Sequence, residues 1–305
     1  MKIFINNPQE NWVVDRFVEE WISYNKHLHT NDIKEADLVW IISPWTWNKL
    51  PYKVLKQKKV ICTIHHIDES KFDNKEEKAF LKRDKIVDTY HCISEKTEEQ
   101  VKRKTRKKTF NLPFWSNPKI FFNITNKENL RDKYGISNND YLVGSFQRDT
   151  EGKDLVSPKL SKGPDQFVQI LKKIQKKQNN IAVLLTGRRR QYIMNELKAA
   201  GIKYYYFEMV RFDELNEMYN MLNLYVVSSR VEGGPQAILE CGLSKTPIIS
   251  TDVGIASKIL SAESIYDFET YNNPIPNVDT AYKNSKKYII PNWFDEYHKL
   301  FRETL

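Results

Sequence analysis

The sequence predicts an α/β protein whose sheets are largely parallel and which is divided into two domains. Short apolar runs alternate with longer, polar, helix-compatible segments over most of the chain, as in repeated strand–helix–strand units. A chain of 305 residues, 40% of them hydrophobic, can form two domains of ordinary size, each with its own core. Prolines and asparagines gather in residues 112–140, so we expect the interdomain boundary there.

In the first half, short apolar runs predict four strands. These are residues 2–5, 38–42, 59–64 and 89–93. Between them, an amphipathic segment at residues 12–24 and a charged segment at residues 76–85 are the expected helices.

The second half repeats this alternation with more regular spacing. The expected strands are residues 141–146, 181–186, 203–207, 224–227 and 247–250. The expected helices are residues 127–134, 164–175, 190–200, 212–221 and 235–243. The closing segment, residues 278–305, is aromatic and again helix-compatible.

The chain is basic, with a net charge of +9. The densest basic run is residues 102–108, and smaller clusters occur at 172–177 and 188–190. Such charge suits nucleic acid, an anionic membrane surface or an acidic substrate, and it does not choose between them. Solvated surface is the commoner role of these runs. The familiar nucleic-acid motifs with aromatic platforms are missing, so we expect no nucleic-acid partner.

The cysteines and the lengths of the apolar runs indicate the cellular compartment in which the protein is expected. Three cysteines, Cys62, Cys92 and Cys241, lie far apart in apolar sequence, which predicts reduced, packed thiols. The first apolar run is too short for a secretory signal, and no later run is long enough to span a bilayer. We therefore expect a cytoplasmic protein, and contact with a membrane surface stays open.

The most informative stretch runs from Glu232 to Glu240 and reads Glu-Gly-Gly-Pro-Gln-Ala-Ile-Leu-Glu, directly after an apolar run. This order predicts a strand, a tight turn and a helix. Gly233 and Gly234 allow close approach of a ligand to the backbone, and Pro235 suits the first helical position. The free amides of that helix end favour an anion such as a diphosphate, while the two carboxylates suit hydrogen bonds from hydroxyls.

The informative stretch continues through residues 246–254, which read Thr-Pro-Ile-Ile-Ser-Thr-Asp-Val-Gly. The whole stretch resembles the donor-site signature of retaining glycosyltransferases with the GT-B fold, specifically glycosyltransferase family four (glycosyl transferases group 1). The resemblance implies two Rossmann-like domains facing across a cleft and a C-terminal helix that crosses back to the first domain. The implied boundaries are 1–122 for the acceptor-side domain, 123–280 for the donor-binding domain and 281–305 for the helix.

A nucleotide-sugar transferase must stabilise the charge of a departing diphosphate. The chain has no Asp-x-Asp motif, so side-chain cations would have to replace a metal ion. By resemblance these are Arg148, after the strand Val143-Gly-Ser-Phe-Gln, and Lys162, in the turn Ser161-Lys-Gly-Pro. A longer loop than usual separates them, and it leaves Lys153 and Lys159 as alternatives to Lys162.

The resemblance also implies donor contacts. Glu240 would accept hydrogen bonds from the ribose, Glu232 from the transferred sugar, and the amides of Gly233 and Gly234, next to Pro235, would lie close to sugar and phosphate. Gly187 and Arg188 follow the strand beside the nucleoside, and Met209 and Val210 occupy the segment that meets the base.

In the first half, His65 and His66 follow a strand, where the family commonly has a histidine facing the reaction centre. We take His65 as the catalytic-side residue, although the register between the two stays open. Adjacent histidines on an extended strand point to opposite faces, which argues against a shared metal. Ser94 is expected to cap a helix. The first strand leads into Asn6-Asn-Pro-Gln-Glu10, where the family often has a glycine-rich loop.

These residues predict a metal-independent retaining glycosyltransferase that needs no cofactor. It would move a sugar from a nucleotide-sugar donor to an unidentified glycan, lipid or protein acceptor. The alternatives are a catalytically silent nucleotide-sugar-binding GT-B scaffold and, with less support, a nucleic-acid-binding protein.

Overall fold

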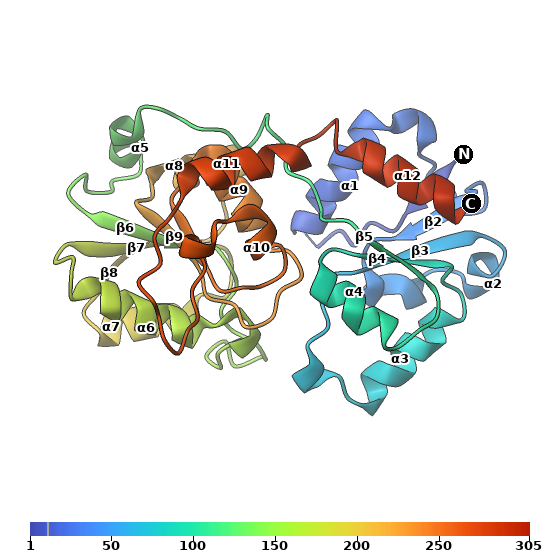
Figure 1. Ribbon diagram of the computed structural model, residues 1–305, viewed down its shortest axis with the longest axis horizontal. Coiled ribbons are helices and arrows are strands. Elements are labelled where there is room, and N and C mark those ends of the chain that lie inside the picture. The colour runs from blue at the N-terminus through green and yellow to red at the C-terminus, as the bar shows by residue number, and fades with distance from the viewer. Residues whose placement is uncertain (11) are drawn as a thin grey trace. The chain divides into compact units, whose positions relative to one another are not determined.

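The computed structural model describes residues 1–10 and 12–305 and divides into two compact units (Figure 1). Unit 1 comprises Met1–Pro113 and Pro291–Leu305, and unit 2 comprises Phe114–Ile290. The divisions at 113/114 and 290/291 differ from the expected 122/123 and 280/281. Residues just after 113 belong with unit 2 because Phe121 is buried in its core, and residues 281–290 because a helix there packs within that unit.

Unit 1 is built on five parallel strands. They are β1 (Ile3–Ile5), β2 (Leu38–Ile41), β3 (Lys59–Ile64), β4 (Thr89–Cys92) and β5 (Lys108–Asn111). Their order in the sheet is simply β1-β2-β3-β4-β5. The strand β5 was not expected, because its sequence Lys-Thr-Phe-Asn has one apolar residue and begins inside the basic run. Backbone pairing with β4 creates this edge strand.

The helices of unit 1 carry their own start signals. They are α1 (Val13–Tyr24), α2 (Tyr52–Leu55), α3 (Asn74–Asp84), α4 (Glu95–Lys102) and α12 (Phe294–Thr304). Asp73 caps α3 by accepting from the amides of Lys75 and Glu76, both at 2.9 Å, so the helix begins two residues before the expected 76. Ser94 accepts from the amide of Thr97 at 3.3 Å, which confirms the expected cap of α4.

The final helix, α12, belongs to unit 1 and packs against α1 (Figure 1). The buried ring of Trp21 lies 5.1 Å from the rings of both Phe294 and Phe301, edge to face in each case. The aromatic pattern near the end of the chain is therefore the apolar face of a helix that completes the core of the first unit. This agrees with the expected return of that helix.

Unit 2 is also built on five parallel strands, in a different order. They are β6 (Tyr141–Ser145), β7 (Ile181–Thr186), β8 (Lys203–Phe207), β9 (Leu224–Val227) and β10 (Ile248–Ser250). The sheet order is β10-β9-β6-β7-β8, so the chain starts in the centre, moves to one edge and then returns to the other side.

Helices cover both faces of this sheet (Figure 1). One core cluster lies under α6 (Pro164–Gln175) and α7 (Gln191–Ala199), and the other under α8 (Phe212–Met221) and α9 (Gln236–Ser244). Burial on both faces explains why β7 reads as a continuous apolar run. The remaining helices are α5 (Lys127–Lys133), α10 (Ala256–Ile259) and α11 (Val278–Ser285), the last packed on α9.

The three cysteines are free and buried, as expected, and burial raises the pKa of Cys62 to about 11. Among the described residues, no helix combines the length and the apolar composition that crossing a bilayer requires.

Candidate functional site

The strand order of unit 2 reverses at one position in the sheet, between β6 and β9. The connections from β6 and β9 lead away in opposite directions, because β6 is followed by β7 on one side and β9 by β10 on the other. In open parallel sheets, ligands bind outside the carboxyl ends of the strands at such a reversal. The residues at this position are those that follow Ser145 and Val227.

Lys162 and Glu232 meet at this point. Lys162 ends a short 3-10 turn, Leu160–Lys162, and its ammonium group contacts the carboxylate of Glu232. The two residues are 70 positions apart in the chain, and their side chains are only 18% and 10% exposed. The structure thus brings together the cation and the carboxylate that were predicted separately.

Two polar residues that the sequence did not single out complete this contact. The amide nitrogen Nε2 of Gln147 donates to the carbonyl of Lys162 at 2.9 Å. The hydroxyl of Ser229 lies 3.3 Å from both Oε1 of Gln147 and Oε1 of Glu232. Gln147 and Ser229 are each the second residue after the end of a central strand, β6 and β9, which is the signal that could have identified them.

Position 163, directly after Lys162, requires a glycine. Its φ is +60°, and a Cβ at this position would lie 1.8 Å from the carbonyl oxygen of Ser228. Only glycine permits both the left-handed backbone and this close approach. Pro164 then begins α6, so the cation, the turn and the helix start are fixed against the end of β9.

A second ion pair holds the same turn. Both terminal nitrogens of Arg230 bind the carboxylate of Asp165, each at 2.7 Å, and one of them also donates to the carbonyl of Leu160 at 3.0 Å. This fork ties the start of α6 to the loop after β9. Neither Arg230 nor Asp165 was assigned a role from sequence.

The Gly-Gly turn is packed against the Thr-Asp-Val-Gly turn. A Cβ at Gly254, where φ is +59°, would lie 2.3 Å from the carbonyl oxygen of Gly233 and 2.9 Å from the amide nitrogen of Gly234. Thr251 also donates to the carbonyl of Ser229 at 2.7 Å. Pro235 is the N-cap of α9 and not its first helical residue, because its ψ of 113° is extended. The helix therefore begins one residue later than expected.

Glu240 lies in α9 and is buried, with 4% of its surface exposed. Its Oε2 accepts a hydrogen bond from the hydroxyl of Tyr219 at 2.8 Å. Burial, together with the charge of Glu240, raises the pKa of Tyr219 well above its usual value, so the phenol remains a donor. The hydroxyl of Tyr219 thus holds one of the two carboxylate oxygens of Glu240.

Arg148 follows β6 and is half-buried, with Nε donating to the carbonyl of Thr150 at 2.7 Å. Burial, and secondarily the charge of Arg189, lowers its pKa. Arg188 is exposed. Gly187, which precedes it, has a φ of +90°.

The third arginine of the cluster at 188–190 is not on the surface. Arg190 is fully buried: its Nε lies 2.8 Å from Oδ2 of Asp149, and its Nη1 donates to the carbonyls of Ser145 and Thr186 at 2.6 and 2.7 Å. The interpretation of this cluster as a solvated face was wrong for Arg190. The guanidinium joins the ends of β6 and β7 and anchors the loop that carries Arg148.

Met209 and Val210 follow β8, the edge strand two places from β6. Met209 is 53% exposed, and Val210 packs against the core. Their assignment to the base stays a prediction.

His65 belongs to unit 1. It follows β3 half-buried, with Nε2 at 2.9 Å from the carbonyl oxygen of Ile42 and its ring centroid 5.5 Å from that of Trp45, while His66 is exposed. Among the side chains that the structure describes, no three His, Cys, Asp or Glu are grouped so that they could hold a metal ion.

His91 is the fully buried histidine of the same sheet. Nδ1 lies 2.9 Å from the hydroxyl of Thr63 and Nε2 lies 2.6 Å from the carbonyl oxygen of Leu112. Burial lowers its pKa to about 4, so the ring is neutral near pH 7. Both ring nitrogens serve to join neighbouring parts of unit 1.

Residues 126–274 match the family model described as Glycosyl transferases group 1. A search of curated proteins found no match.

Solved structures with the same architecture cover nearly the whole chain. A sucrose-phosphate synthase from Thermosynechococcus elongatus matches with a TM-score of 0.70 and 15% identity, over 98% of this chain and 80% of that one. Anabaena HepE in complex with UDP and glucose matches with a TM-score of 0.76 and 10% identity, over 99% and 100%. A glycosyltransferase from Rickettsia africae matches with a TM-score of 0.62 and 16% identity, over 98% and 83%.

At these identities the structural matches establish the fold, which is GT-B. The family match covers most of unit 2, including the turns that carry Lys162 and Glu232. The chain therefore has the GT-B fold, and its residues 126–274 match the model of Glycosyl transferases group 1.

Proposed function

We propose that the protein is a retaining, metal-independent glycosyltransferase that moves a sugar from a nucleotide-sugar donor to a hydroxyl-bearing acceptor. The observation that carries this proposal is the Lys162–Glu232 contact at the strand-order reversal of unit 2. A cation, a carboxylate and a glycine turn at a helix start are the groups needed to hold a diphosphate and a sugar at one place.

The roles follow from the chemistry of each group. Lys162 and Arg148 offset the negative charge that develops on the leaving diphosphate. The amides of the Gly233-Gly234 turn add donors at the start of α9. Glu232 accepts hydrogen bonds from the sugar hydroxyls, and its contact with Lys162 keeps the ammonium group in place before the donor arrives.

In the proposed step, the bond between the anomeric carbon and the diphosphate oxygen breaks, and the acceptor oxygen bonds to the same carbon on the same face. The proton of the acceptor hydroxyl passes to the leaving diphosphate. The resemblance to family four supports this same-face course, and His65 is proposed to hydrogen-bond the sugar or the phosphate.

A donor screen tests the proposal first. Each nucleoside diphosphate and its sugars, beginning with UDP and UDP-glucose because HepE was solved with UDP and glucose, is added in a thermal-shift assay. A ligand at a hundred times its dissociation constant stabilises by about 2.7 kcal/mol, a shift of roughly 5–10 °C for a domain of this size. Stabilisation by no member of the panel contradicts a nucleotide-sugar donor.

Turnover separates an enzyme from a silent scaffold. Donor consumption is followed with an acceptor panel, with chelator and with added magnesium. We expect consumption that chelator leaves unchanged, and a product whose anomeric configuration by NMR matches the donor. Donor binding without consumption supports the scaffold, and loss of activity in chelator that magnesium restores contradicts metal independence.

The basic run at residues 102–108 gives little support to a nucleic-acid function. Lys102 pairs with Glu98 at 3.1 Å, Arg103 with Glu69 at 2.5 Å, and Lys108 with Glu303 at 2.8 Å. Pairing with nearby carboxylates offsets much of the charge that a phosphate backbone would need. We place the enzyme in the cytoplasm and leave the acceptor as glycan, lipid or protein, with a membrane-surface contact open.

A further inference from the structure

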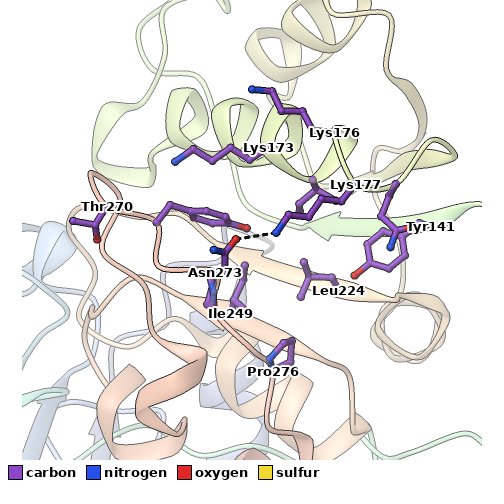
Figure 2. A pocket seen from close by; sticks show the side chains of 13 residues that line it. Tyr141, Lys173, Lys176, Lys177, Leu224, Ile249, Thr270, Asn273 and Pro276 are labelled. Carbon is purple, nitrogen blue, oxygen red and sulfur yellow. Dashed lines mark hydrogen bonds between the residues drawn. The ribbon is translucent and has the colours of Figure 1, made fainter.

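A cavity of about 500 Å³ lies in unit 2, within the range of roughly 300–1,000 Å³ that holds small molecules (Figure 2). Its lining includes Tyr141 and Leu224, the first residues of β6 and β9. Because all strands of this sheet are parallel, their amino ends lie at the edge opposite the Lys162–Glu232 contact. The cavity is therefore separate from the proposed donor site.

Three lysines line this cavity: Lys173 in the last turn of α6, Lys176 at its C-cap and Lys177 just after it. No aspartate or glutamate is among the lining residues. This differs from the basic run at 102–108, where three cations are paired with carboxylates. No carboxylate of the lining therefore offsets the positive charge of these lysines.

Lysines at the end of a helix also complement the helix dipole. That role applies equally to Lys172, which lies in the same turn but does not line the cavity. The other three lysines line the cavity, and Lys172 therefore provides an internal control.

The facing wall is apolar and aromatic. Ile249, Pro274 and Pro276 contribute to it, together with the ring of Tyr271. The ammonium group of Lys173 lies 4.6 Å from the centre of that ring, and Lys177 donates to Oδ1 of Asn273 at 2.9 Å (Figure 2). Contacts across the cavity thus hold both walls in place.

The loop that carries this wall is conformationally strained. Tyr271 and Asn273 have φ values of 38° and 50°, a region that a tyrosine rarely adopts. The amide of Tyr271 donates to the carbonyl of Asp267 at 2.8 Å, and its ring packs edge to face on that of Tyr266 at 5.7 Å. Strain maintained by such contacts is typical of ligand sites.

We propose that this cavity binds a small phosphomonoester that carries a sugar or similar ring. Lys173 and Lys177, which contact the facing loop, provide two ammonium groups for the double charge of a phosphomonoester, and ammonium groups act on phosphate as compact point charges. The apolar wall and the ring of Tyr271 provide the surface for the body of the ligand. The proposal does not depend on the donor site.

Titration calorimetry with glucose 6-phosphate, inorganic phosphate and glucose tests it, at low salt because exposed charges are screened. Glucose 6-phosphate should bind with a dissociation constant below about 1 mM, more tightly than phosphate, and glucose should not bind measurably. The double variant Lys173→Ala/Lys177→Ala should weaken binding about tenfold or more, and Lys172→Ala should not. Saturating UDP should leave binding unchanged, because it is expected at the other edge of the sheet.

The outcomes that would overturn the site are specific. They are no binding of glucose 6-phosphate up to about 10 mM, equal weakening by Lys172→Ala, displacement by UDP, or equal affinity for inorganic phosphate, which would remove the role of the apolar wall. Thermal melts of the variants show that they are folded, and the substituted lysines are exposed side chains. A protein that binds no nucleotide but binds glucose 6-phosphate would refute the proposed function and leave this site standing.

Discussion

The two sheets of this protein have the same number of strands and the same parallel direction, but they differ in strand order. In unit 1 the order follows the chain, β1-β2-β3-β4-β5, whereas in unit 2 it reverses around β6. Only the second arrangement sends successive connections away in opposite directions, which is the condition for a ligand site at the carboxyl ends of the strands. Similar secondary structure therefore gives one unit a site that the topology of the other does not.

The polar groups of the two units also differ, in how far they are exposed. In unit 1, His91 connects Thr63 to the carbonyl of Leu112 inside the core. In unit 2, Lys162 and Glu232 are partly exposed at the end of the sheet. The first arrangement stabilises the fold, and the second leaves a cation and a carboxylate within reach of a ligand.

The largest expected effect concerns the cations of unit 2. Lys162→Ala and Arg148→Ala should each lower turnover of the donor about a hundredfold or more, because each removes charge that offsets the leaving diphosphate. Lys198→Ala, an exposed lysine of α7 with no assigned role, is the control and should change turnover less than twofold. Steady-state kinetics measure all three, and near-normal turnover in both site variants would refute the assignment.

The next effect concerns the contact between the Lys-Gly turn and β9. Gly163→Ala should destabilise unit 2 by about 3 kcal/mol or more, because a Cβ would meet the carbonyl of Ser228 in addition to the strained backbone. Gly201→Ala is the control: its φ of +64° is similar, but no atom lies within 4 Å of the added Cβ, so only about 1 kcal/mol is expected. Urea unfolding of both variants gives the difference, and equal costs would show that the close approach is unimportant.

The smallest effect concerns the pH dependence of unit 1. Between pH 6.5 and about 4, an unfolded chain binds a proton that buried His91 does not, so lowering the pH favours unfolding. From pH 7.5 to 5.5 this should cost about 1 kcal/mol. Burial also lowers the pKa of His298 in the same unit, so His91→Gln should reduce the dependence without removing it.

Tryptophan fluorescence reports on this unit selectively, because six of the seven tryptophans, all but Trp115, belong to unit 1. Urea unfolding at the two pH values measures the effect. If unit 1 were equally stable at both, the buried neutral state of His91 would not be contributing.

Much of the fold could be predicted from local sequence. Every expected strand is present, and most helix bounds agree within one or two residues, because periodicity and capping act over a few positions. The edge strand β5 escaped prediction because its pairing with β4 depends on a partner elsewhere in the chain. The site motif around Glu232 was recognisable for the same local reason: its glycines, proline and carboxylates lie within nine residues.

What the sequence alone determined is therefore most of the strands and helices, the two-unit organisation and the residues of the turns. Tertiary structure decided which of these residues meet: Lys162 with Glu232 across 70 positions, Gln147 with Ser229, and Arg190 in the interior beside Asp149. It also decided which lysines are neutralised and which face a cavity. The physical reason is that charge pairing and burial depend on distances in space, which strand order sets and local sequence patterns do not contain.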